Sequence, residues 1–247
     1  MALYGVLGDI HGNLEALHAV LAAFDARGVE QLLCVGDVVG YNADPDECAA
    51  LLRARHALAI AGNHDLIATG GLGFDRCSNK ARYSLSRTRK RLAPETAAWL
   101  RTLPANRIVE GSIALVHGGV RDVQLYMTTR DHIRANAELL AADFPAARVC
   151  FFGHSHAQKL YDAAGHDQPL GTPLERDRVY FINAGSVDAQ RKRGERLAEC
   201  ALFDSDTWRI RFLELPYDSA ATEAKAALGG YRIPPIVDLF YTLRARM

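Results

Sequence analysis

Five short apolar runs recur along the first 156 residues, and each ends abruptly in a polar cluster, four of which begin with glycine. Runs of four or five apolar residues bounded in this way are typical of buried β-strands. The runs and their clusters are Leu3–Leu7 before Gly8-Asp9-Ile10-His11, Gln31–Val35 before Gly36-Asp37, Ala57–Ala61 before Gly62-Asn63-His64-Asp65, Ile113–Val116 before His117-Gly118, and Val149–Phe152 before Gly153-His154-Ser155-His156. This repeated ending predicts strands whose carboxyl ends carry the chemistry of the protein.

Helical patterns lie between the first of these runs. Leu14, Leu17, Leu21 and Phe24 form one apolar stripe, with Asn13 as its expected N-cap, and a second helix is expected to begin at Pro45. Strand–helix–strand alternation predicts parallel strands with right-handed crossovers and a sheet covered on both faces. In such sheets functional residues gather beyond the carboxyl ends of the strands, where all five polar clusters would lie.

The rest of the chain is expected to differ in character. Residues 66–104 have a helical pattern, with Pro94 opening a second helix there, and residues 218–247 form a helical C-terminal region. Residues 163–177 read as an exposed loop. Antiparallel strands are expected at Val179–Ile182, Leu197–Phe203 and Trp208–Leu215, because these runs are rich in β-branched and aromatic residues.

Composition limits the class of protein. The chain has 247 residues, of which 49% are hydrophobic, and its 29 basic and 29 acidic residues balance. The length allows one large α/β domain or two small ones, and the balanced charge disfavours broad electrostatic binding of nucleic acid, although a local basic patch is compatible with it. No signal peptide and no membrane span are expected. The five cysteines form no CxxC pair, which indicates buried reduced thiols in a cytoplasmic protein.

The polar clusters contain the ligands of a metal site. Their potential ligands are Asp9, His11, Asp37, Asn63, His117, His154 and His156. Nitrogen and oxygen donors without a thiolate suit Mn, Fe, Zn, Co or Ni better than Mg or Ca. Taken alone, an Asp-x-His motif is more often a turn or a cap than a pair of ligands, Gly-Asn-His-Asp could be a turn, and His117 could be a core histidine. Their ordered succession at five strand ends favours a metal site. Two cations held there would favour an anionic substrate and acidify a bridging water.

These motifs resemble the signature of the calcineurin-like metallophosphoesterases. The resemblance rests on the five clusters above and spans residues 8–156. Gly36-Asp37-Val38-Val39-Gly40-Tyr41, the following Asp44-Pro45, and Asn183-Ala184-Gly185-Ser186-Val187 are similar to the small bacterial phosphodiesterase branch. The resemblance implies one domain over residues 1–247, with a two-sheet mixed β sandwich flanked by helices and a helical insertion at about 66–104.

The same resemblance implies a dinuclear site. One metal would be held by Asp9, His11, Asp37 and His156, and the other by Asp37, Asn63, His117 and His154. Asp37 would then bridge two divalent ions, for which manganese is favoured. The implied reaction is cleavage of phosphoesters, chiefly phosphodiesters, by a metal-bridging hydroxide. His64 would assist the leaving group, and Asp65 would orient His64.

Differences from the motifs of the enzymes that it resembles narrow the range of substrates expected for this chain. Protein phosphatases and symmetrical diadenosine tetraphosphatases carry arginines where this chain has Val38-Val39-Gly40-Tyr41, and protein phosphatases carry another where it has Ala61. A small phosphorylated substrate is therefore expected, with phosphomonoesterase or nucleotide phosphatase activity as the alternative. A non-catalytic metal-binding scaffold is a minor alternative because His64 is present. A nuclease is disfavoured by the neutral charge.

The basic residues outside the motifs allow two interpretations, contact with the substrate or exposure on the surface. Arg121 and Arg191 follow polar clusters and are candidates for contacting a substrate phosphate. A basic stretch with little acidic relief could form a solvated helix face or an approach surface for a nucleotide, and the first is favoured. Its members are Arg76, Lys80, Arg82, Arg87, Arg89, Lys90 and Arg91. The sequence predicts no oligomeric state.

Overall fold

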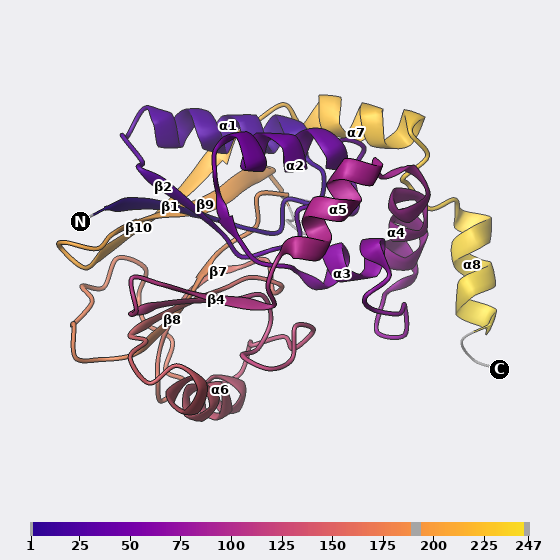
Figure 1. Cartoon of the computed structure of the whole chain (residues 1–247). Coiled ribbons are helices and arrows are strands. Elements are labelled where there is room, and N and C mark those ends of the chain that lie inside the picture. Colours follow the sequence, from indigo (N-terminus) through magenta and orange to yellow (C-terminus); the bar gives the residue numbers. More distant parts are fainter. Residues whose placement is uncertain (1, 189–193, 245–247) are drawn as a thin grey trace.

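The computed structural model describes residues 2–188 and 194–244, which fold as two stacked five-stranded sheets flanked by helices (Figure 1). The strands of the first sheet, in spatial order, are β10 (Arg209–Pro216), β9 (Leu197–Asp204), β1 (Leu3–Leu7), β2 (Gln31–Cys34) and β3 (Leu58–Ala59). Those of the second sheet are β4 (Asn106–Val109), β5 (Ile113–Val116), β6 (Val149–Phe152), β8 (Tyr180–Ala184) and β7 (Gln158–Asp162). This confirms the two-sheet sandwich implied by the resemblance.

Three neighbouring strands of each sheet are parallel to one another. Strands β1, β2 and β3 are parallel, with Val6 opposite Leu33, and β5, β6 and β8 are parallel, with Phe151 opposite Ile182. The expectation of a single sheet from strand–helix alternation alone is therefore wrong. Three polar clusters follow strands of the first sheet and two follow strands of the second, so the site forms where the carboxyl ends of two sheets meet.

Alternate residues of the strands fill different layers of the core. Val6, Leu33, Phe151 and Ile182 pack between the two sheets. Their neighbours on β1 and β2 face helices α1 (Leu14–Asp25) and α2 (Pro45–Ala54), while α6 (Arg130–Asp143) covers the outer face of the second sheet. Complete burial of one such large apolar side chain contributes about 1.5–3 kcal/mol, so these layers fix the strands that carry the site.

The predicted helices are present. Asn13 caps α1, because its side-chain oxygen accepts a hydrogen bond from the Ala16 N–H at 3.1 Å. The helical region after the third cluster comprises α3 (Asn63–Thr69), α4 (Asn79–Arg91) and α5 (Pro94–Thr102), and the C-terminal region comprises α7 (Ser219–Leu228) and α8 (Pro235–Arg244). In Figure 1, α3, α4 and α5 stand beside the two sheets, and α8 lies outside α4.

The structure corrects several strand assignments. The edge strands β4 and β7 were not expected, because their residues are mostly polar and only partly buried. Strand β3 has two residues instead of the five in Ala57–Ala61. Strand β8 pairs in parallel with β6 and antiparallel with β7, so it is only half antiparallel, whereas β9 and β10 form the expected antiparallel pair.

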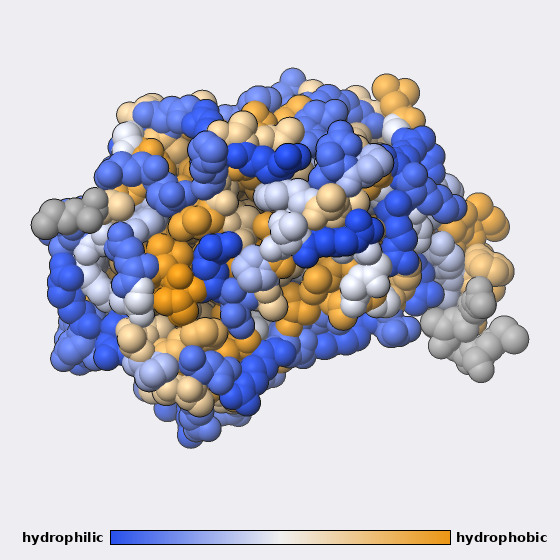
Figure 2. Space-filling view, viewed as in Figure 1, coloured by the Kyte–Doolittle hydropathy of each residue, from blue (hydrophilic) through white to orange (hydrophobic). Residues whose placement is uncertain are grey.

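The expected burial of the cysteines is largely confirmed. All five cysteines are free, and only Cys77 is not fully buried. No described helix is long and apolar enough to cross a membrane. The surface in Figure 2 is largely hydrophilic, with an apolar group over α8 at its right-hand side. That group includes Ile236, Leu239, Phe240 and Leu243, each more than half exposed.

Candidate metal centre

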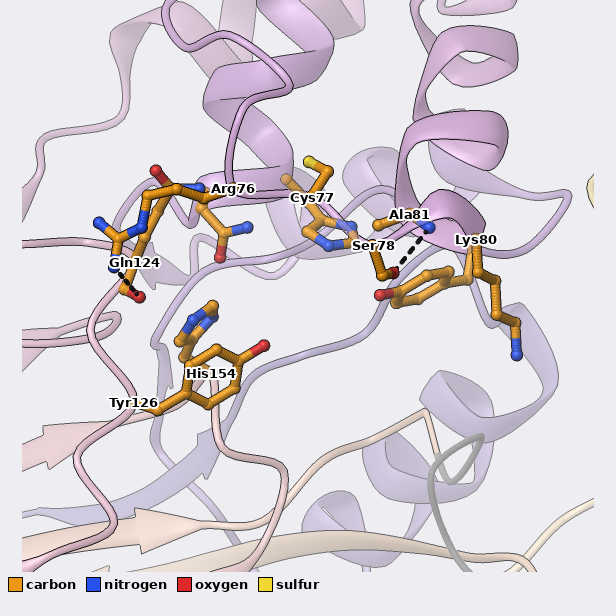
Figure 3. A pocket seen from close by; sticks show the side chains of 11 residues that line it. Arg76, Cys77, Ser78, Lys80, Ala81, Gln124, Tyr126 and His154 are labelled. Carbon is orange, nitrogen blue, oxygen red and sulfur yellow. Dashed lines mark hydrogen bonds between the residues drawn. The ribbon is translucent and has the colours of Figure 1, made fainter. Parts of the chain in front are cut away.

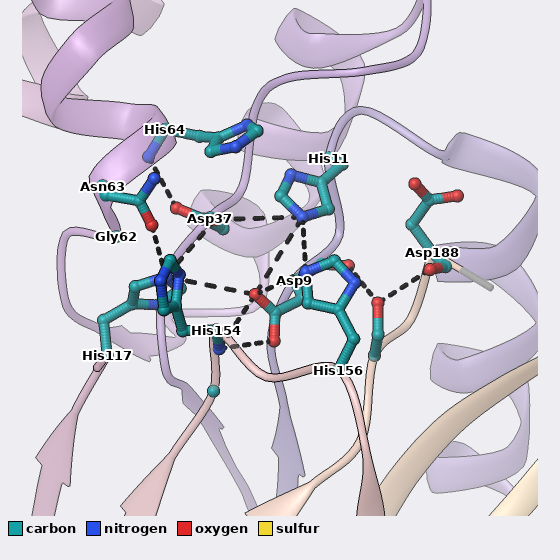
Figure 4. Close-up of polar contacts among 12 residues, drawn as sticks. Asp9, His11, Asp37, Gly62, Asn63, His64, His117, His154, His156 and Asp188 are labelled. Atoms are coloured by element: carbon teal, nitrogen blue, oxygen red, sulfur yellow. Dashed lines mark hydrogen bonds and ion pairs between the residues drawn. The ribbon is translucent and has the colours of Figure 1, made fainter. Parts of the chain in front are cut away.

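All seven predicted metal ligands meet in one buried cluster (Figure 4). Asp9 and His11 follow β1, Asp37 follows β2, Asn63 opens α3 after β3, His117 follows β5, and His154 and His156 follow β6. None of these seven residues is more than 6% exposed. Burial of so many polar groups at one point costs free energy unless they are paired or bind a charge, which marks the cluster as a binding site.

One half of the cluster groups two histidines around a carboxylate. His11 Nε2 and His156 Nε2 lie 3.1 Å apart, and His156 Nε2 lies 3.4 Å from Asp9 Oδ1. The Nδ1 of His11 faces the Val39 carbonyl at 3.4 Å and must act as the donor there, so the neutral ring presents its lone pair at Nε2. Burial and the neighbouring His64 lower the pKa of His11 well below its usual value, which keeps the ring neutral.

The other half of the cluster surrounds His117. Its Nδ1 donates a hydrogen bond to the Val35 carbonyl at 2.7 Å, which directs Nε2 towards Asn63 Oδ1 at 3.0 Å and Asp37 Oδ2 at 3.3 Å. The His154 ring lies 5.2 Å from the His117 ring, and one ligand atom from each of Asp37, His117 and His154 falls within 4.8 Å of the others. Asp37 Oδ2 is also 3.8 Å from His11 Nε2, so it faces both halves.

The electrostatics of the cluster favour a positive charge. Burial lowers the pKa of His117, but the carboxylates of Asp37 and Asp9 outweigh it and raise that pKa to about 9. Burial raises the pKa of Asp37 and of Asp9, but nearby histidine rings more than offset it and hold both pKa values well below the usual range. The place between the oxygens and the His117 Nε2 therefore suits a proton or a metal ion, which compete for it.

The backbone of the cluster is strained. Asp9, His11, Asp37, His154 and His156 all have φ between +49° and +65°, in the left-handed region that residues other than glycine seldom adopt. Only three other residues in the described ranges, apart from glycines, share this conformation. A left-handed residue of this kind costs about 1–3 kcal/mol, and such strain concentrates at functional sites. The strain, the facing nitrogens and the carboxylate oxygens fit a metal-binding site.

Backbone hydrogen bonds hold the two ligand carboxylates. The N–H of His154 donates to Asp9 Oδ2 at 2.9 Å, and the N–H of His64 donates to Asp37 Oδ1 at 2.7 Å. The His154 N–H also lies 3.2 Å from Asp9 Oδ1, so it spans both oxygens of Asp9, whereas in Asp37 a backbone N–H holds Oδ1 alone. In Asp37 the other oxygen, Oδ2, is the one that faces His11 and His117.

His64 lies beside the cluster, and its ring also lines a pocket. Its centroid is 4.5 Å from that of His11 and 4.8 Å from that of Tyr41. Gly40 makes room for it, because a Cβ at Gly40 would come within 2.5 Å of His64 Nδ1. This position is compatible with contact to a substrate, and the role of His64 towards a leaving group stays a prediction.

Asp65 connects two of the loops that carry ligands. Its carboxylate oxygens accept hydrogen bonds from the N–H of Val39 at 3.1 Å and of Gly62 at 2.9 Å. Burial and the charge of Asp37 raise the pKa of Asp65 to about 7, although the two N–H donors lower it in part. Asp65 therefore holds the Asp37 loop against the start of α3, and its expected effect on His64 stays a prediction.

The segment Asn183–Val187 positions the ligand loops from the second sheet. Asn183 Nδ2 donates to the Gly153 carbonyl at 2.9 Å, next to His154. The Ser186 hydroxyl donates to the Asp9 carbonyl at 3.0 Å. The motif thus fixes one ligand loop of each sheet, and the sequence indicated it only through the resemblance to the phosphodiesterase branch.

The structure does not bring Arg121, one of the two arginines proposed for phosphate binding, to the cluster. The Arg121 side chain is mostly exposed and donates to Asp143 on α6, with Nε 2.8 Å from Oδ2. It does not line the pocket beside His64, so its contact with a substrate stays a prediction. Arg191 lies outside the described residues.

Most arginines of the basic stretch donate hydrogen bonds to backbone carbonyls of neighbouring segments. Arg89 donates to the Ile67 carbonyl near the end of α3, and Arg87 and Arg91 donate to the Gly229 carbonyl after α7. Positive charges at helix C-termini are favourable because the carbonyls there carry partial negative charge. Neither sequence reading anticipated this use. Arg76 and Lys80 differ, because both line the pocket beside His64.

Sequence reasoning did not assign two aromatic residues that border the cluster. The Tyr41 ring lies 4.8 Å from the His11 ring, and the Tyr126 ring lies 4.0 Å from the His154 ring. Tyr41 stands in the quoted motif after Asp37, but nothing in the sequence near Tyr126 marks it. Its position depends on the path of the chain after β5.

We expect Gly62→Ala to disrupt the cluster. A Cβ at Gly62 would lie 2.1 Å from Asp37 Oδ1 and 2.2 Å from the Asp37 backbone nitrogen, so the Asp37 loop must move. Overpacking of this kind costs about 1–3 kcal/mol. Denaturant unfolding should show a lower stability than that of the wild type, and elemental analysis should show a lower metal content.

Gly71→Ala is the matched control, because its Cβ would meet ordinary contacts at 3.5 Å on Leu66. It should retain metal content and unfold near the wild-type midpoint. A Gly62→Ala protein with unchanged metal content and stability would show that the Asp37 loop is not held against α3 as described.

Comparisons with known proteins agree with this geometry. Residues 2–207 match the calcineurin-like phosphoesterase superfamily domain. An uncharacterised protein of Methanocaldococcus jannaschii is 30% identical over 229 residues, which cover 88% of each chain. A metallophosphoesterase from Sphaerobacter thermophilus is 30% identical, with a TM-score of 0.75 over 96% of this chain and 97% of that one. A hypothetical protein from Pyrococcus horikoshii shares the fold at 20% identity, with a TM-score of 0.71 over 96% of each chain. Since the matched domain covers more than four-fifths of the sequence and includes every residue of the cluster, the chain belongs to the calcineurin-like phosphoesterase superfamily.

Proposed function

We propose that this chain, a metal-dependent phosphoesterase by its family, hydrolyses phosphodiesters with the help of two divalent metal ions. The observation that supports the proposal most directly is the position of Asp37. Its Oδ2 lies 3.3 Å from His117 Nε2 and 3.8 Å from His11 Nε2, between the two halves of the cluster. A single carboxylate oxygen facing two groups of histidines suits a ligand shared by two cations.

The residues of the cluster would have separate roles in binding metal and in assisting the leaving group. Asp9, His11 and His156 would hold one cation with Asp37, and Asn63, His117 and His154 would hold the other with Asp37. A bound pair of this kind supplies an activated water nucleophile and neutralises phosphate charge. His64, at the pocket wall, would hold a proton for the leaving oxygen, and manganese is the ion we favour for this mixed nitrogen and oxygen donor set.

The preference for diesters follows from the charges near the cluster. Val38, Val39 and Ala61 are fully buried apolar residues at the places where protein phosphatases carry arginines. A monoester dianion would miss those cations more than a diester monoanion does. Phosphomonoesterase or nucleotide phosphatase activity remains the second candidate, because Lys80 lines the pocket and would offer a cation to a dianionic phosphate.

Removal of metal should abolish hydrolysis. After treatment with a chelator, the protein should no longer cleave bis(p-nitrophenyl) phosphate. Manganese should restore cleavage, because the proposed ligands are carboxylates, an amide and imidazoles that bind a metal in their neutral form. Metal content by elemental analysis should change in parallel. With the metal restored, the specificity constant for this diester should equal or exceed that for p-nitrophenyl phosphate.

Each other outcome has a definite meaning. Full activity in protein shown to be metal-free would refute the dinuclear mechanism. A strong preference for the monoester would favour the phosphatase alternative. Two bound metals without hydrolysis of either ester would favour the non-catalytic scaffold.

A further inference from the structure

A pocket of about 350 Å³ opens beside the cluster (Figure 3). One wall is formed by His64 and His154, which belong to the cluster or border it, together with Tyr41. The opposite walls come from two segments far apart in the sequence, residues 76–81 before and within the first turn of α4, and residues 124–126 after β5. A group joined by an ester bond to a phosphate on the cluster would enter this space.

The two outer segments are joined by Arg76. Its Nη1 lies 3.0 Å from Asp122 Oδ2, and its Nη2 donates to the Gln124 carbonyl at 2.9 Å. These contacts hold residues 122–126 against the start of the helical region. They also balance the charge of Arg76, so this side chain contributes more to the shape of the pocket than to attraction of a second anion.

Tyr126 adds an exposed aromatic ring to the pocket wall. Tyr126 is 44% exposed, and its ring packs 4.0 Å from the His154 ring at a tilt of 37°. In Figure 3 its ring lies beside His154 at the base of the pocket, with the hydroxyl directed towards the open space. Among the described residues that line the pocket there is no aspartate or glutamate, while Ser78 and Gln124 offer polar groups.

We propose that this pocket binds a planar ring-bearing alcohol of the nucleoside class, and that Tyr126 is the surface on which its base stacks. The inference rests on the proposed function, because the phosphate of the same substrate would lie on the metal cluster. A half-exposed ring that already packs against His154 can stack with a base at the pocket wall. A simple alkyl alcohol would not use that ring, and of the two cations that line the pocket Arg76 is already paired with Asp122.

The size of the pocket agrees with this assignment. Small-molecule sites commonly enclose about 300–1,000 Å³ and combine an apolar or aromatic wall with a few polar groups. Stacking of a base on an aromatic side chain is worth about 5- to 140-fold in affinity per base. Tyr126 is therefore a specificity-determining residue, and the Ser78 and Gln124 side chains are placed to contact the edge of the base.

The test compares two ligands that differ only in the base. Binding of adenosine 5′-monophosphate and ribose 5-phosphate to the manganese-loaded protein is measured by isothermal titration calorimetry, with chromatography to verify that both ligands remain intact. We expect adenosine 5′-monophosphate to bind roughly 5- to 140-fold more tightly. Tyr126→Leu should remove most of that ratio, whereas Tyr126→Phe should retain it, because the ring and not the hydroxyl stacks.

Equal affinity for the two ligands in the wild-type protein would overturn the inference, as would binding of neither. A Tyr126→Leu protein with a native circular dichroism spectrum and an undiminished ratio would also overturn it. The wild-type ratio tests the inference even if a variant fails to fold. Cleavage of bis(p-nitrophenyl) phosphate is measured separately, so the proposed function can hold while the nucleoside assignment fails, and the reverse is equally visible.

Discussion

Asp37→Asn is expected to lose its tightly bound metal pair and nearly all hydrolysis while it keeps its fold. The variant is almost isosteric. Its amide oxygen can still accept the His64 N–H that now donates to Asp37 Oδ1 at 2.7 Å. That hydrogen bond then directs the NH₂ group to the place of Oδ2, which faces His11 and His117. An NH₂ group has neither the lone pair nor the negative charge needed to bridge two cations.

The measurements are metal content by elemental analysis, circular dichroism and turnover of a diester. Asp188→Asn is a matched control, because Asp188 is also buried near the cluster but accepts a hydrogen bond from Asn13 at 3.0 Å, which an amide oxygen can replace. It should keep two metals. Asn63→Ala or His117→Ala should chiefly empty one site, because each residue belongs to one half only.

A folded Asp37→Asn protein with two tightly bound metals and near-normal turnover would disprove the shared ligand. The proposed mechanism would fail with it, since the position of Asp37 between the two histidine groups is its main support. Loss of one metal only would show that Asp37 serves a single site.

The second large effect concerns His64. His64→Ala should lower turnover by about 10²–10⁴, the usual contribution of a general acid, while both metals stay bound. The ring lies next to His11, at a centroid distance of 4.5 Å, and lines the pocket that would receive the leaving group. The loss should be smaller for p-nitrophenyl esters than for alkyl esters, because a good leaving group needs little protonation.

The decisive measurement is the metal content of His64→Ala, determined together with its turnover. His18→Ala, which removes an exposed histidine from α1, serves as the control and should behave as wild type. One ligand atom of His64 lies within 4.8 Å of ligand atoms of His11 and Asp37, so the alternative that His64 is itself a ligand has a definite geometry. If His64→Ala loses a metal, that alternative is correct and the assignment of His64 as an acid is wrong.

The residues of the cluster could be predicted from the sequence because each of them follows the end of a buried strand. A buried run that stops at a glycine places the next polar residues at the edge of a sheet, and neighbouring parallel strands bring such edges together. Asp9, Asp37 and Asn63 follow β1, β2 and β3, which are adjacent in the first sheet. Their convergence therefore needed only the strand–helix alternation that the apolar pattern already shows.

Other features required the tertiary structure. Local periodicity does not say which sheet a strand joins, and the separation of β5 and β6 into a second sheet depends on packing among residues far apart in the sequence. The edge strands β4 and β7 escaped detection because an edge strand is half solvated and carries little apolar signal. The helices beside the cluster were predicted as helices, but their position was not.

The sequence by itself determined the ligand types, their order along the chain and the parallel strands that display them, since these follow from local patterns of two to ten residues. Only the tertiary structure decided that Asp37 Oδ2 faces both histidine groups and that Tyr126 lies against His154. It also decided that Arg76 joins residues 122–126 to the helical region. These contacts join segments separated by 26 to 80 residues, and their geometry depends on how two sheets and the helices beside them pack, which no local pattern encodes.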